Sequence, residues 1–168
     1  LYKMVDWAVA TGQKIIQILP INDTTMTHTW TDSYPYNVNS TFALHPMFIR
    51  PEAIGRLSDE GKLSEYRSIA KELNALAEID YERVNDTKTA YLKDLFAEYG
   101  NETVSSDSFK SFVERNEYWL MSYAAFCVLR DMKGTADFKL WGKYASYDKK
   151  SIEKFCSENT DEINFIYF

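Results

Sequence analysis

A short apolar segment that stops at a proline is the feature that most constrains this sequence. Residues 15–19 are IIQIL, and Pro20 follows directly. A nearly continuous run of branched apolar residues is typical of a strand covered on both faces, as in a parallel sheet. We therefore expect residues 15–19 to form a buried strand of an α/β fold.

An amphipathic helix is predicted immediately before this strand. Gly12 is well placed to end the helix, and a helix that leads into a buried strand through a short turn is half of a β-α-β unit. The apolar residues that recur at helical spacing are Leu1, Met4, Val5, Ala8 and Val9.

Residues 21–45 form a polar, aromatic loop without helical periodicity. A loop this long is seldom a mere connection, and loops at the carboxyl ends of parallel strands hold the sites of α/β folds. Aromatic rings can pack on the C–H faces of a pyranose while polar side chains bond its hydroxyls. The mixture suits a sugar, although anchoring of the loop and capping of turns explain it equally well. The rings are Trp30, Tyr34 and Tyr36, and the polar neighbours are Asp32, Ser33, Asn37, Asn39 and Ser40.

The same stretch resembles a known enzyme family. Residues 18–24 are ILPINDT, and residues 32–50 are DSYPYNVNSTFALHPMFIR. These motifs resemble the signature of glycoside hydrolase family 77, the 4-α-glucanotransferases also called amylomaltases or disproportionating enzymes. The matching residues are Leu19, Pro20, Thr24, Pro35, Tyr36, Ser40, Ala43 and Pro46.

One departure from the family pattern narrows the resemblance. Tyr34 stands where most members have serine, and with the FALHP motif of residues 42–46 it resembles the branch that includes the plant cytosolic enzyme. The likeness continues through Asp80 and Tyr81 and through residues 119–130, with Trp141 and Gly142 beyond.

The resemblance implies a fragment, mostly α in content, of a (β/α)8 TIM barrel. Residues 1–46 would hold the first helix, the second strand and its substrate-binding loop. Residues 47–160 would form an inserted α-helical subdomain, and residues 161–168 would begin a returning barrel helix.

The predicted insertion reads as a series of amphipathic helices. Apolar residues at helical spacing predict helices at 63–77 and at 81–99, the second ending at Gly100. A further helix starts after Ser106, bends near Asn116 and ends by Gly134. Asp148 and Thr160 are the expected caps of the last two. Aromatic stripes at such spacing are far more often core than ligand platform.

The resemblance implies sugar binding without catalysis by this segment. Retaining glycosidic chemistry needs two carboxylates about 5–5.5 Å apart. The family places them on later barrel strands, so we assign no catalytic residue and expect the chain alone to be inactive. By the same resemblance Tyr36 would stack on the transferred sugar and Tyr34 would widen that platform. Asp32 would bond sugar hydroxyls or, more in keeping with its position, pin the loop, while Ser40 would cap a turn.

The resemblance implies α-glucans such as maltodextrins as substrates, and composition argues against other classes of partner. A net charge of −6 without a Lys/Arg cluster argues against nucleic acid. No apolar run approaches a membrane span, which favours a cytoplasmic protein without a membrane partner. The two cysteines, Cys127 and Cys156, are far apart in the sequence, which favours free thiols. With only two histidines beside them, the sequence argues against a metal or cofactor. The alternative is a non-catalytic helical module that binds carbohydrate or protein.

Overall fold

The computed structural model describes residues 2–168, and it is mostly helical, as predicted. The first half contains α1 (Tyr2–Ala10), η1 (Trp30–Ser33), η2 (Pro46–Phe48), α2 (Pro51–Ile54), α3 (Glu60–Asn74) and α4 (Tyr81–Ser105). The second half contains α5 (Asp107–Lys133), η3 (Phe138–Leu140), η4 (Gly142–Tyr144), α6 (Lys149–Glu158) and α7 (Thr160–Tyr167). The η elements are short 3-10 turns.

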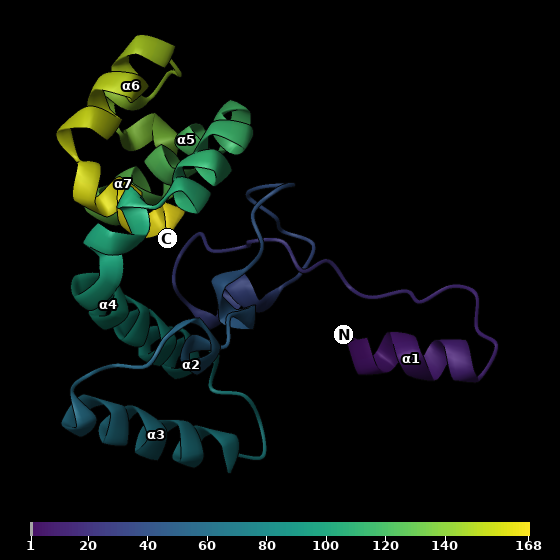
Figure 1. Cartoon of the computed structure of the whole chain (residues 1–168). Helices are drawn as coiled ribbons and strands as arrows, with labels where there is room; N and C mark the ends of the chain where they lie inside the picture. Colours follow the sequence, from purple (N-terminus) through teal and green to yellow (C-terminus); the bar gives the residue numbers. More distant parts are fainter. Residues whose placement is uncertain (1) are drawn as a thin grey trace.

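Two apolar clusters hold the helices together. The first joins α5, α6 and α7, and the second joins α3 to α4 and receives Phe165 and Phe168 from the end of the chain. Figure 1 shows α4 running from the group formed with α2 and α3 toward the group formed by α5, α6 and α7. The buried members of the first cluster are Ala124, Ala125, Val128, Leu129, Trp141, Ile152, Phe155 and Ile163. Those of the second are Leu57, Leu63, Tyr91, Leu92 and Leu95.

Local caps limit α4, α5 and α6, and those at Ser106, Gly134 and Asp148 were predicted. The Ser106 side chain accepts a hydrogen bond from the Phe109 amide at the start of α5, and Gly134 ends the helix with a left-handed φ of 64°. Asp80 caps α4 through the Arg83 amide, and Asp148 caps α6 through the Ser151 amide. Asn159, rather than Thr160, is the residue before α7.

Two predicted interruptions are wrong, because neither residue breaks its helix. Gly100 lies inside α4, where a Cβ atom would come within 2.8 Å of the Phe96 ring, so a glycine here allows close packing instead of ending the helix. Asn116 lies inside an unbroken α5. Its amide donates to the Phe112 carbonyl at 2.8 Å and accepts from the Trp119 indole at 3.0 Å, and both partners are on the same helix.

The predicted strand at residues 15–19 does not form. Residues 13–21 have no regular structure, and Ile15 is 85% exposed. Figure 1 shows α1 and this segment extending away from the helical groups. The backbone groups of a strand need an adjacent strand as partner, and residues 2–168 contain no other strand to supply one. α1 matches the predicted helix, but Met4, Val5 and Val9 of its expected apolar stripe are exposed, and Leu1 lies outside the described residues.

The division into residues 1–46, 47–160 and 161–168 remains a prediction. Among the residues that the structure describes, no helix combines the length and apolar character needed to cross a bilayer.

Candidate functional site

The loop of residues 21–45 is closed at its base by backbone hydrogen bonds. Asn22 and Leu44 form an isolated antiparallel bridge. The Asp23 amide donates to the Ala43 carbonyl and the His45 amide donates to the Ile21 carbonyl, each at 2.9 Å. The two ends of the loop are therefore fixed to each other, and the segment between them is held from outside by α4 and α5.

Asp32 holds the first turn of this loop from within. Its carboxylate accepts hydrogen bonds from the amides of Met26 at 3.1 Å, Thr27 at 2.9 Å and His28 at 2.7 Å. Its own carbonyl accepts from the Thr24 hydroxyl. The residue is only 3% exposed, so the structure gives Asp32 the contacts of the loop-pinning role.

Tyr34 and Tyr36 lie on the outside of the loop, next to each other. Each is 60% exposed, and their ring centroids are 5.5 Å apart with an angle of 56° between the planes. The Ser40 hydroxyl accepts from the amides of Phe42 and Ala43, as expected of a turn cap. Neither tyrosine is enclosed in the helical core, and contact of these two rings with a sugar remains a prediction.

Asp23 is a second buried carboxylate, which sequence reasoning did not single out. Its Oδ1 accepts from the Thr25 amide at 3.0 Å and the Thr25 hydroxyl at 2.6 Å. Its Oδ2 accepts from the Asn39 amide group and from the Tyr123 hydroxyl of α5, each at 2.8 Å. With 1% exposure, this carboxylate joins both arms of the loop to α5.

A buried arginine near the end of α5 makes the next connection. Arg130 donates from Nη1 to the Thr25 carbonyl at 2.6 Å and from Nε to Asp131 at 2.7 Å. Asp131 also contacts Nε2 of His28 at 2.8 Å. Burial tends to raise the pKa of Asp131, but the hydrogen bonds from His28 and Arg130 outweigh it and hold that pKa below its usual value. His28 has a positive φ of 59°.

α4 holds the far end of the loop through His45. Nδ1 of His45 accepts from the Met47 amide at 3.0 Å, so Nε2 carries the proton and donates to the Tyr81 hydroxyl at 2.6 Å. Burial lowers the pKa of His45, against the opposing charges of Asp23 and Asp32. The imidazole therefore favours its neutral form, which is the form that these two hydrogen bonds require.

The contacts that hold the loop were only partly predictable from the sequence. Tyr81 was part of the family resemblance, but its bond to His45 was not expected. Tyr123 and Arg130 lie in the segment 119–130 that carries the resemblance, and the contacts of neither residue were predicted. The available signal for a polar contact was an arginine directly after the apolar segment that ends with Val128 and Leu129.

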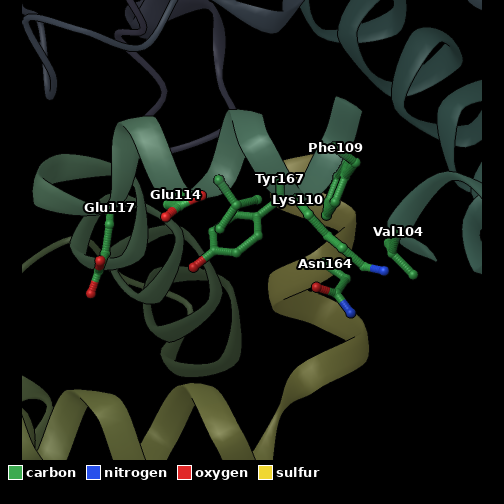
Figure 2. A pocket seen from close by; sticks show the side chains of 8 residues that line it. Val104, Phe109, Lys110, Glu114, Glu117, Asn164 and Tyr167 are labelled. Carbon is green, nitrogen blue, oxygen red and sulfur yellow. The ribbon is translucent and has the colours of Figure 1, made fainter. Parts of the chain in front are cut away.

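A separate cavity lies among α4, α5 and α7, and Figure 2 shows its lining. Its volume is about 420 Å³, and aromatic side chains from Phe109 and Tyr167 meet polar groups of Lys110, Glu114 and Asn164 there. None of the predicted site residues lines it. In the part of the chain from 2 to 168, His, Cys, Asp and Glu side chains form no group of three suited to a metal ion.

Comparison with known proteins defines the class of this helical chain with its aromatic loop. A family model described as 4-alpha-glucanotransferase, that of glycoside hydrolase family 77, matches residues 1–168. The chain therefore belongs to glycoside hydrolase family 77, and the family resemblance is confirmed.

Individual relatives share different parts of the chain. It is 41% identical over 170 residues to "4-alpha-glucanotransferase DPE2" of rice, which covers 98% of this chain and 18% of the rice protein. It is 35% identical over 135 residues to a 4-alpha-glucanotransferase of Chlamydia muridarum, which covers 78% of this chain and 24% of that protein. The chain thus spans about a fifth to a quarter of the length of these relatives. No solved structure matches it.

Proposed function

We propose that this chain forms part of a 4-α-glucanotransferase that moves α-1,4-glucan segments between maltodextrin chains. The family membership and the identity to the rice protein support this activity. By the same inference, residues 1–46 contribute to a (β/α)8 barrel, and the enzyme works in the cytoplasm on neutral glucans.

The pair of exposed tyrosines carries the proposal at the level of the site. Tyr34 and Tyr36 present two adjacent rings, and beneath them the loop is fixed by two buried carboxylates, Asp23 and Asp32. A rigid platform of exposed aromatic rings binds a sugar face with little ordering cost. In this proposal Tyr36 stacks on the glucose unit to be transferred, and Tyr34 extends the surface to its neighbour.

The proposed chemistry is a retaining double displacement. One carboxylate attacks the anomeric carbon while a second, protonated carboxyl gives its proton to the departing glucan. A sugar hydroxyl then returns a proton to that second group and displaces the first carboxylate from the anomeric carbon. We assign neither carboxylate to this chain, because the buried Asp23 and Asp32 are already engaged by hydrogen-bond donors of the loop and of α5. The isolated chain should therefore release no glucose from maltotriose.

Replacing Tyr36 in the enzyme that contains this sequence tests the proposal. Tyr36→Ala should lower kcat/KM for maltotriose disproportionation roughly tenfold or more, which corresponds to the loss of about 1.5 kcal/mol of aromatic contact. Tyr147→Ala is the matched control, since Tyr147 is exposed to a similar extent, 67% against 60% for Tyr36, and lies outside the loop. Equal activity of Tyr36→Ala and Tyr147→Ala would remove the stacking role. A helical module that only binds would retain maltodextrin without turning it over in any context.

A further inference from the structure

A chain of hydrogen bonds runs from helix α5 to the segment that carries the two exposed tyrosines. The Tyr123 hydroxyl donates to Oδ2 of Asp23 at 2.8 Å, and the same oxygen accepts from the Asn39 side chain at 2.8 Å. The backbone N–H of Asn39 also donates to the backbone carbonyl of Asp23, at 2.8 Å. Asn39 is three residues beyond Tyr36, so Asp23 and Asn39 link the segment that carries Tyr36 to α5.

A water molecule does not take the place of the Tyr123 hydroxyl as a donor to Asp23. Asp23 is almost fully buried, so water does not replace a lost Tyr123 donor, and the carboxylate keeps only the hydrogen bonds from Thr25 and Asn39. Burial, followed by the nearby Cys127 and Asp23, raises the pKa of Tyr123, so the phenol keeps the proton that it donates. Arg130 fixes the first arm of the loop separately, through the Thr25 carbonyl. Loss of the Tyr123 hydroxyl should therefore loosen the loop without releasing it.

We propose that Tyr123 is a positioning residue for glucan binding, which holds the Tyr34–Tyr36 rings in their orientation through Asp23 and Asn39. The inference rests on the proposed function, because it assumes that these rings contact glucan. It makes the helical region a determinant of substrate affinity, although Tyr123 itself contacts no sugar.

Tyr123→Phe in the full enzyme tests the inference. We expect KM for maltotriose to rise about tenfold, as for one lost hydrogen bond to a charged group, with kcat changed less than about twofold. Hydrogen exchange of the amides in residues 22–44 should accelerate by a similar factor. Tyr118→Phe is the matched control, because Tyr118 is an exposed tyrosine of the same helix whose ring contact with Phe42 survives the change.

The background of Tyr36→Ala separates positioning from general stability. In that background Tyr123→Phe should raise KM much less than in the original enzyme, since of the two rings that it positions only Tyr34 remains. An unchanged KM in the single variant, or an equal rise in both backgrounds, would overturn the inference. Asn39→Ala breaks the same link from the other side and should reproduce the KM increase and its dependence on Tyr36.

Failure of the proposed function would look different. If Tyr36→Ala leaves both kcat/KM and KM unchanged while Tyr123→Phe still speeds exchange in residues 22–44, the loop is held as described but does not bind glucan, and both proposals fall. If Tyr36→Ala raises KM and Tyr123→Phe affects neither KM nor exchange, only the positioning role falls.

Discussion

The helical core and the aromatic loop are stabilised by different kinds of contact. The cluster of α5, α6 and α7 is built from apolar side chains such as Leu129, Ile152 and Phe155. The loop instead is fixed by two buried carboxylates that accept hydrogen bonds from its own backbone and from α5. Apolar packing tolerates small shifts, whereas hydrogen bonds require their geometry. A loop held in this way can keep large aromatic rings at its surface.

Substitutions in the apolar cluster of α5, α6 and α7 should lower the free energy of unfolding the most. Leu129 is 2% exposed inside the cluster, so Leu129→Ala should lower the free energy of unfolding by about 2–5 kcal/mol through lost burial and a residual cavity. Urea denaturation of the chain measures the change. Leu140→Ala is the control, because Leu140 is 69% exposed and should cost under about 0.5 kcal/mol. Similar losses for the two leucines would show that the cluster does not dominate stability.

The same contrast explains what the sequence could predict. The helices predicted at 63–77 and 81–99 are observed at 60–74 and 81–105, and those predicted after Ser106 and Asp148 are observed at 107–133 and 149–158. The predictions used apolar periodicity and local caps such as Ser106 and Asp148. Both depend on neighbours within a few residues along the chain. The predicted end at Gly100 and the predicted bend at Asn116 were wrong, because glycine and asparagine can either break a helix or pack within it.

The candidate site was predictable only in part. The exposed pair of Tyr34 and Tyr36 and the capping Ser40 came from the family resemblance and from local turn chemistry. The bond between Asp23 and Tyr123 joins residues 100 positions apart, and no local pattern encodes it. At residues 15–19 the local pattern was present but misleading. The composition favours a strand, but a strand forms only beside a partner strand.

A smaller, pH-dependent effect should arise where α4 holds the loop. The pKa of His45 is lowered from 6.5 by burial, so folding favours the neutral ring. The stabilisation is complete above the unfolded pKa and is lost as the pH falls from about 6.5 toward the lower folded value. Protonation would also place an N–H on Nδ1 against the Met47 amide. The urea concentration at the unfolding midpoint should therefore decrease when the pH is lowered from 7.5 to 5.5.

His45→Asn isolates this contribution. Its side-chain oxygen can still accept from the Met47 amide, but it does not titrate. The variant should be less stable at pH 7.5, because the Tyr81 contact is lost, and its midpoint should change less with pH than that of the original chain. Identical slopes for the two proteins would refute the role of His45 in the pH response.

The smallest expected effect is at the exposed contact between His28 and Asp131. Their side chains are 55% and 46% exposed, and such pairs contribute about 0–1 kcal/mol. Asparagine tolerates the positive φ of 59° at position 28, so His28→Asn should cost about 0.5 kcal/mol in urea denaturation. His28→Ala should cost about 1 kcal/mol more, because alanine is strained in the left-handed region. A loss above about 2 kcal/mol for His28→Asn would mean that an exposed polar contact rivals the apolar core, and the contrast between the two regions would fail.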